Sequence, residues 1–153
     1  MAPSIAVCKD RGFTLIELLI AVVVLGVLAV VAMPTFVDSI RKSRRSEAFT
    51  ALAAVQQAQE RWRANHASYT TDLSSTGLNL PSTTSGGYYG IAVDAADATG
   101  YTVTASAASG SSQVSDGNCA RLRVRAAGGN LHYGSAATSG SFDESPGNRC
   151  WSR

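Results

Sequence analysis

A long uncharged segment near the N-terminus is the feature that most restricts how this chain can fold. No residue from Leu18 to Val37 carries a charge, and only Glu17 interrupts the apolar run that begins at Phe13. At about 1.5 Å of rise per residue, a helix of this length crosses the roughly 30 Å hydrocarbon core of a bilayer. A carboxylate deep in lipid costs about 2.5–3.5 kcal/mol on insertion scales, so Glu17 needs a partner or a function.

The residues at the start of this segment carry a family resemblance. Residues 12–17 read Gly-Phe-Thr-Leu-Ile-Glu after a short leader with basic residues, and they resemble the class III signal of type IV pilins and pseudopilins. In that family a prepilin peptidase cleaves after the glycine, and the new N-terminal phenylalanine is then methylated. The resemblance implies that residues 1–12 are a leader that is removed, that cleavage follows Gly12, and that Phe13 is N-methylated.

Two other interpretations explain less of this region. An ordinary secretory signal peptide has an apolar core of about 7–15 residues followed by its cleavage site. Here the core is longer, and the glycine precedes it. A plain membrane anchor accounts for the apolar run but not for Glu17. The resemblance implies a single-pass precursor in the bacterial inner membrane that later becomes part of an extracellular pilus filament.

The resemblance also implies which residues act in assembly. A carboxylate buried among packed apolar helices is tolerated when it is paired with a cation. We therefore predict that Glu17 pairs with the new α-amino group of Phe13 in a neighbouring subunit. Pro34 removes a backbone hydrogen bond and predicts a helix kink. The expected partners are other pilin subunits, the prepilin peptidase and methyltransferase, the inner-membrane assembly platform and, before assembly, the lipid bilayer.

The apolar helix over residues 13–37 is expected to continue as an amphipathic helix over residues 38–69. Five residues recur there at spacings of three and four, which places them on one face against a sheet. They are Ala48, Leu52, Val55, Gln59 and Trp62. The basic cluster over residues 41–45 is expected to be solvated or near lipid headgroups, with a filament contact as the alternative.

Residues 70–153 are predicted to form a small globular β domain. A loop rich in Ser, Thr and Gly over 72–87 precedes the strands, which are predicted at 88–94, 101–106, 120–125 and, after a Gly-Gly-Asn turn, 131–133. Their spacing suits an antiparallel meander whose apolar face covers the helix. The predicted fold is α+β, a type IV pilin fold in which a long N-terminal hydrophobic helix packs on an antiparallel sheet of three or four strands.

The third predicted strand carries an unusual row of arginines. Arg121, Arg123 and Arg125 alternate with apolar residues, so the alternation of a strand places the three on one outward face. Together with Arg149 they form a basic stripe of the kind that contacts DNA phosphates. A solvated strand face is the simpler alternative, and the sequence leaves both open.

Three cysteines are present, and Cys8 belongs to the leader. Cys119 and Cys150 remain as a pair, for which a disulfide is the leading interpretation in a small exported domain. Two separate buried thiols are the alternative. A loop closed by these residues resembles the disulfide-bounded D-region of type IV pilins. Neither cysteine has the spacing of a zinc site.

No arrangement of residues in the sequence supports catalysis. There is no Gly-x-Ser-x-Gly, no phosphate-binding P-loop and no metal-binding histidine pair, and His66 and His132 are isolated. Both histidines are expected at the surface. The net charge of +2 does not by itself indicate a nucleic-acid binder. We therefore expect no enzyme activity, no cofactor and no metal.

These features together predict a structural subunit, most simply a minor pilin, of a type IV pilus used for adhesion, twitching motility or DNA uptake. One alternative is a pseudopilin of a type II secretion system. Major pseudopilins typically carry a calcium loop and lack this cysteine pair, and Asp143 with Glu144 is too sparse for calcium. The other alternative is a DNA-binding uptake receptor that uses Arg121, Arg123 and Arg125.

Overall fold

The computed structural model describes residues 12–151, apart from the side chains at positions 34 and 35. The expected leader before Gly12, including Cys8, lies outside the described residues, as do residues 152 and 153. The chain forms two compact units that meet in sequence between Val37 and Asp38. Helix α1 (Leu15–Arg63) contributes to both units.

Helix α1 begins with a capping arrangement. The Thr14 hydroxyl accepts a hydrogen bond from the backbone N–H of Glu17, with 3.3 Å between N and Oγ1. A threonine followed three residues later by a glutamate is the pattern of a capping box, and a carboxylate in the first turn favours the positive end of the helix dipole. Thr14 therefore caps the start of α1, and the Glu17 carboxylate lies in its first turn.

The first unit consists of the apolar part of α1 up to Val37. Its described side chains are exposed, including large apolar ones such as Leu18, Val24 and Leu28. Within residues 12–151, α1 is the one helix long and apolar enough to cross a membrane. The backbone is helical at Pro34, and the kink expected there stays a prediction.

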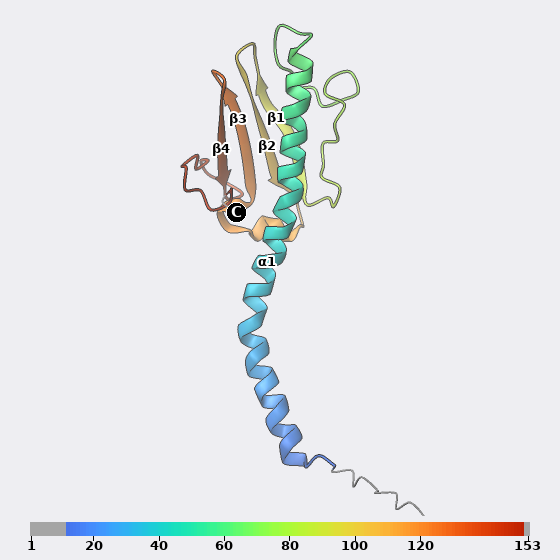
Figure 1. Cartoon of the computed structure of the whole chain (residues 1–153), viewed down its shortest axis with the longest axis vertical. Helices are drawn as coiled ribbons and strands as arrows, with labels where there is room; N and C mark the ends of the chain where they lie inside the picture. The colour runs from blue at the N-terminus through green and yellow to red at the C-terminus, as the bar shows by residue number, and fades with distance from the viewer. Residues whose placement is uncertain (1–11, 152–153) are drawn as a thin grey trace, which may run out of the picture. The chain divides into compact units, whose positions relative to one another are not determined.

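The second unit contains a four-stranded antiparallel sheet in the order β1-β2-β3-β4 (Figure 1). The strands are β1 (Tyr89–Ala96), β2 (Gly100–Ala107), β3 (Arg121–Ala127) and β4 (Asn130–Ala136). The predicted α+β meander is confirmed. All four strands end later than predicted, and β1 and β3 begin one residue later. Gly128 and Gly129 make the β3–β4 turn, where φ angles of 55° and 81° favour residues without a Cβ.

Both outer edges of the sheet are partly covered by irregular chain. At the β1 edge, Thr83 forms a bridge with Gly90, and the Ser82 carbonyl accepts a 2.7 Å hydrogen bond from a β1 backbone N–H. At the β4 edge, Ser135 and Asp143 exchange two backbone hydrogen bonds of 3.0 and 2.8 Å. The loop predicted over 72–87 thus follows the first edge, and the C-terminal loop follows the second.

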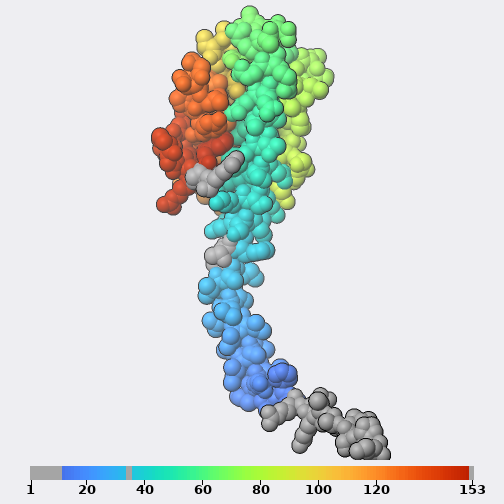
Figure 2. All heavy atoms as spheres, in the orientation of Figure 1, coloured from blue at the N-terminus to red at the C-terminus, as the bar shows by residue number. Residues whose placement is uncertain are grey.

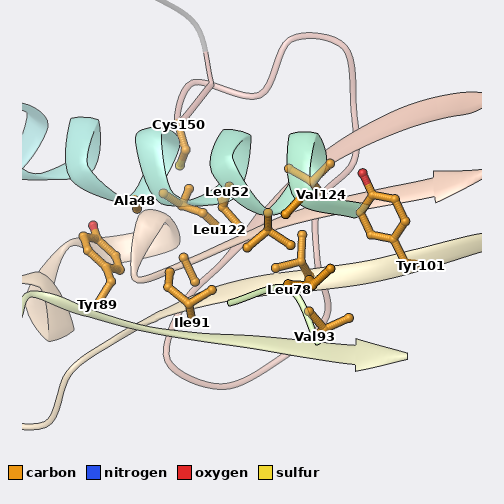
Figure 3. Close-up of a cluster of buried hydrophobic side chains, with 14 of the residues drawn as sticks. Ala48, Leu52, Leu78, Tyr89, Ile91, Val93, Tyr101, Leu122, Val124 and Cys150 are labelled. Carbon is orange, nitrogen blue, oxygen red and sulfur yellow. The ribbon is translucent and has the colours of Figure 1, made fainter. Parts of the chain in front are cut away.

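The core lies between one face of the sheet and the amphipathic part of α1. Figure 3 shows these side chains converging, with Tyr89 and Tyr101 at opposite ends of the cluster. The centre is formed by Ala48, Leu52, Val55, Leu122 and Val124, each at most 1% exposed. Full burial of a leucine or valine side chain contributes about 1.5–3 kcal/mol, so this contact is the main attachment of α1 to the sheet.

Helix α1 ends at Arg63, so the prediction that it continues to residue 69 is wrong. The buried amide of Gln59 pairs with the backbone of Thr70: Nε2 donates to the carbonyl at 2.6 Å, and Oε1 accepts from the N–H at 3.2 Å. The Arg63 guanidinium donates to the His66 carbonyl at 2.7 Å. These hydrogen bonds turn the chain back along α1, and a longer helix would break them.

A polar cluster ties α1 to the connection between β2 and β3, which contains the short 3-10 helices η1 (Ser112–Ser115) and η2 (Gly117–Cys119). Arg45 forms a two-point ion pair with Asp116, at 2.6 Å from Nε and 2.7 Å from Nη2. Only 6% of the Asp116 side chain is exposed. The hydrogen bond to Asp116 raises the pKa of the Arg45 guanidinium. In the same cluster, the Gln113 amide donates a hydrogen bond to Tyr89 Oη at 2.7 Å.

The basic cluster over residues 41–45 is therefore not uniformly solvated. Lys42 is exposed, as predicted. Arg45 is half-buried in its ion pair, and Arg44 bonds the Ser112 hydroxyl and lies 4.2 Å from the ring centre of Tyr88. The prediction is wrong for both arginines because their partners lie far along the chain, and helix periodicity gives no information on such contacts.

We expect Asp116→Ala to lower the free energy of unfolding of the second unit by about 3 kcal/mol, because it leaves the Arg45 charge buried and unpaired. Near-UV circular dichroism of the full chain in detergent reports on this unit, since every tryptophan and tyrosine lies at or beyond Trp62. The double change Arg45→Met with Asp116→Leu removes both charges. It should lower the free energy of unfolding by less than Asp116→Ala alone. An Asp116→Ala variant as stable as the original chain would contradict this account.

Candidate functional site

The expected processing and assembly residues lie at the start of α1. Gly12 precedes the helix, and a Cβ built on it meets no atom within 4 Å. Phe13 is 77% exposed. Glu17 is exposed and takes part in no ion pair within residues 12–151. Its carboxylate is therefore accessible to a cation supplied by another molecule.

The arginine row of β3 lies on the face of the sheet that α1 does not cover. Antiparallel register places Arg121, Arg123 and Arg125 opposite small polar residues of β2. The side chains between them, Leu122 and Val124, are fully buried in the core. The outward orientation predicted from the alternation is confirmed, and all three arginines are half-buried rather than fully solvated.

The C-terminal loop crosses this face and contacts each arginine of the row. Arg121 donates to the carbonyls of Ala137 and Gly140, at 2.8 and 2.7 Å. Arg123 lies over the ring of Phe142, with 3.5 Å between Cζ and the ring centre. Arg125 forms an ion pair and two hydrogen bonds with a carboxylate of the same loop, Glu144. The row is therefore held in place by the loop.

The loop approaches β4 closely because position 134 is a glycine. A Cβ on Gly134 would lie 3.0 Å from Glu144 Cγ and 3.5 Å from Phe142 Cβ. The Trp151 indole donates to the Gly134 carbonyl at 2.9 Å. Buried Asn148 donates to the Asp143 carbonyl at 2.6 Å. One of these hydrogen bonds fastens the loop to β4, and the other holds the loop in its own conformation.

A disulfide joins Cys119 to Cys150, with 5.5 Å between the Cα atoms, which confirms the predicted pair. Cys119 ends η2, directly before β3, and Cys150 lies next to Trp151. Closing a loop of this length stabilises a chain by about 3–4 kcal/mol in the chain-entropy description. The bond therefore fastens the C-terminal loop to the strand that carries the arginine row.

Two features of this site were missed from the sequence. Phe142 and Glu144 lie in a segment that was predicted only as loop, and they are the groups that contact Arg123 and Arg125. The available signal was a single aromatic residue beside two carboxylates in a tail otherwise rich in Ser and Gly. The described residues hold no group of three or more His, Cys, Asp or Glu side chains that could bind a metal.

A half-exposed guanidinium that is held in place can bind a phosphate group of a ligand with little loss of side-chain entropy. Arg123 is the best placed of the row, because its contact within residues 12–151 is a ring face rather than a hydrogen bond. Within the same residues its Nε is buried without a hydrogen-bond partner, so a ligand can reach only the Nη groups. Arg121 and Arg125 already donate to oxygens of the loop. The site therefore offers one strong anion contact flanked by two partly occupied ones.

Two family models match the chain. One, described as type IV minor pilin ComP, DNA uptake sequence receptor, covers residues 34–123. The other, described as a prokaryotic N-terminal methylation motif, covers residues 8–33. The first match therefore includes the amphipathic part of α1 and ends within β3, at the middle arginine of the row.

The chain is also similar to curated pilus proteins. It is 31% identical over 96 residues to fimbrial protein EcpC of Eikenella corrodens, covering 63% of this chain and 61% of that protein. It is 35% identical over 79 residues to the type IV major pilin PilE of Neisseria gonorrhoeae, covering 52% and 47%. Identity with the type IV major pilin PilA of Myxococcus xanthus is 48% over 52 residues, covering 34% and 24%. The chain thus spans between 24% and 61% of the length of these relatives.

The ion pair between Arg125 and Glu144 predicts how the C-terminal loop responds to pH. The hydrogen bond from Arg125 lowers the pKa of the Glu144 carboxyl. Its stabilising contribution is therefore complete above the pKa of an unfolded glutamate, about 4.3, and is lost as pH falls through the lower folded value. We expect the loop to loosen in this acidic range.

Trp151 fluorescence, measured in a Trp62→Phe background during acid titration, reports this loosening because Trp151 bonds to Gly134 beneath the loop. Glu144→Gln should remove most of the transition. Asp143, whose pKa is lowered by hydrogen bonds from Ser145, titrates in the same direction, so Asp143→Asn is the matched comparison. An unchanged transition in Glu144→Gln would show that another group controls the loop.

Proposed function

Because the chain belongs to the type IV minor pilin family described as ComP, DNA uptake sequence receptor, we propose that it is a pilus subunit that binds double-stranded DNA for uptake. The observation that carries the proposal is the family match over residues 34–123. Of the roles considered from the sequence, DNA uptake is the one that this description supports. The relatives named as pilins and fimbrial proteins favour a pilus over a secretion pseudopilin.

The proposal includes the maturation route of a prepilin. The subunit begins as a single-pass protein of the inner membrane, is cleaved after Gly12 by the prepilin peptidase, and is methylated at Phe13. The match to the N-terminal methylation motif over residues 8–33 and the length of the apolar part of α1 support this route. The assembly platform of the inner membrane then transfers the subunit from the bilayer into an extracellular filament.

Assembly depends on Glu17 in this proposal. In the filament the apolar parts of α1 from several subunits pack together, and an unpaired carboxylate there would be strongly unfavourable. The α-amino group of Phe13 from a neighbouring subunit supplies the cation. A single buried polar pair in an otherwise apolar bundle sets the register of the helices, because every other offset leaves the charges apart.

The β3 face supplies the DNA contact of this proposal. Arg121, Arg123 and Arg125 project from it, and charge-assisted hydrogen bonds from guanidinium groups bind phosphates in a way that does not depend on base sequence. Two of the three arginines already donate to oxygens of the loop, so the number of phosphate contacts is small. This surface therefore provides non-specific capture of DNA rather than recognition of a sequence.

Glu17→Gln should leave membrane insertion intact and strongly reduce incorporation into filaments. Glutamine keeps the side-chain acceptor that a capping box requires and removes only the charge. The measurement is the amount of protein in sheared surface filaments relative to the membrane fraction. The control is Asp38→Asn, which removes an exposed carboxylate further along α1. Normal incorporation of Glu17→Gln into filaments would contradict the pairing hypothesis.

Arg123→Gln should weaken binding to duplex DNA of random sequence and lower the slope of log K against log salt concentration by about one. The full chain in nanodiscs is titrated with labelled duplex at several salt concentrations. Lys42→Gln removes an equal charge from an exposed position outside the sheet. It should reduce the affinity for duplex DNA and the salt slope by less than Arg123→Gln does. If the original chain binds no duplex DNA, the proposed function is wrong. An unchanged slope in Arg123→Gln would instead exclude the β3 face from the contact.

A further inference from the structure

Strand β4 is the outermost strand at one side of the sheet, and part of its outer edge is open. Ser135 exchanges two backbone hydrogen bonds with Asp143 of the C-terminal loop, so both backbone groups of Ser135 point away from β3. These directions alternate along a strand, and the pairing of β4 with β3 runs over residues 130–136 without a shift in register. The N–H and C=O groups of Leu131 and Tyr133 therefore point outward as well.

These four outward groups have no partner in the part of the chain that the structure describes. There, the C-terminal loop forms backbone hydrogen bonds with the outer edge of β4 only at Ser135. The side chains at the open stretch are apolar and accessible, since Leu131 is 47% and Tyr133 40% exposed. An edge with free N–H and C=O groups and exposed apolar side chains is a template for pairing with another extended chain.

A hollow of about 490 Å³ lies along this open stretch, between β4 and the C-terminal loop. Tyr133 lies opposite buried Val124, so it lines the hollow from the face of the sheet that packs on α1. His132, the preceding residue of β4, lines the hollow from the other face. Leu131 and Trp151 add to the apolar wall, and the ring centres of Trp151 and Tyr133 are 4.9 Å apart. The hollow is therefore at the edge of the sheet and receives side chains from both faces.

The C-terminal loop shows which kind of ligand this edge accepts. Its residue Asp143 pairs with Ser135 in an antiparallel bridge, so an extended main chain already occupies the next position along the edge. Beyond Asp143, Glu144 and Pro146 line the far side of the hollow. Figure 2 shows this loop, in red, standing out from the side of the second unit. The loop thus obstructs the approach of a whole second sheet and leaves a slot for a single extended segment.

We propose that the outer edge of β4 over residues 130–133 binds an extended peptide segment of another protein by strand addition. Main-chain hydrogen bonds to Leu131 and Tyr133 supply the affinity, and the alternate side chains of the segment supply the specificity. In an antiparallel pair, residues directly opposite each other project to the same face. The residues opposite Leu131 and Tyr133 are therefore apolar and contact Trp151, and the residue between them is polar and faces His132. This protein contact adds to the proposed function and does not depend on DNA.

The probe is a synthetic peptide capped at both ends, Lys-Thr-Val-Thr-Val-Thr-Lys, whose two valines have the spacing of Leu131 and Tyr133. It is titrated into the full chain in nanodiscs carrying Trp62→Phe, in which Trp151 is the remaining tryptophan and lines the hollow. Trp151 fluorescence should change and reach saturation. The amide hydrogens of Leu131 and Tyr133 should exchange more slowly with solvent in the complex.

Methylation of the peptide nitrogens tests the main-chain pairing directly. In the proposed complex the two valines direct their N–H and C=O groups toward β4, and the threonine between them directs its groups away. One N-methylated valine should therefore weaken binding about tenfold, because it removes a donor and leaves an acceptor of β4 unpaired. N-methylation of the central threonine should leave most of the affinity. Equal affinities of the two methylated peptides would overturn strand addition.

A variant of the chain tests the location of the site. Leu131→Thr keeps a residue that favours strands and removes an apolar contact, so it should weaken peptide binding several-fold. The matched control is Val114→Thr, which changes an apolar side chain that is 40% exposed outside the sheet and should bind the peptide like the original chain. Near-UV circular dichroism should be unchanged in both variants. Absence of saturable binding by the original chain, or unchanged binding in Leu131→Thr, would overturn this inference.

Discussion

Helix α1 is held on the sheet by an apolar contact that has a satisfied polar group near each end. The apolar part is non-directional, so by itself it would tolerate a shift of the helix along the sheet. The polar parts are directional, because a shift would leave buried donors and acceptors unpaired at a cost of about 1–3 kcal/mol for each group. Gln59 with Thr70 and Arg45 with Asp116 thus set the register of α1. The start of β3 and the disulfide beside it take their positions from this register.

The C-terminal loop changes the character of the arginine row. On an isolated strand these long side chains would be mobile, and ordering each of them would cost a ligand about 0.5–1.5 kcal/mol. The loop orders them in advance through carbonyl oxygens, a phenyl ring and a carboxylate. It also neutralises part of their charge. The resulting surface attracts phosphates less strongly at long range, but its guanidinium groups have fixed positions for contact at short range. This combination suits a protein of low net charge.

The sequence predicted those parts of the molecule in which local pattern and tertiary contact agree. The alternation of Arg123 with Leu122 and Val124 placed the strand faces correctly, and the glycine pair placed the turn between β3 and β4. The end of α1 was missed because the side chain of Gln59 decides it through Thr70, and helix periodicity carries no information on such a contact. The partners of Arg44 and Arg45 were missed for the same reason.

The contacts of the candidate site were the least accessible to prediction. Phe142 and Glu144 lie in a segment without periodicity, where no local rule states which distant residue a side chain will meet. The predicted contact of Glu17 with Phe13 is limited in another way, because a single chain cannot show it. Their predicted contact lies between two molecules, so the fold of one chain leaves it as a prediction. The local capping of α1 by Thr14 is the part of this region that one chain determines.

The two covered edges of the sheet have a consequence for crowding. An open edge strand offers unpaired N–H and C=O groups, and neighbouring molecules tend to join their sheets through it. Here Thr83 beside Gly90 and Asp143 beside Ser135 already occupy part of these groups. In a filament, where many copies lie at high local concentration, such blocking keeps each sheet separate from the next. Cohesion is then left to the apolar helices, and a subunit can join or leave the array without exchanging strands with its neighbours.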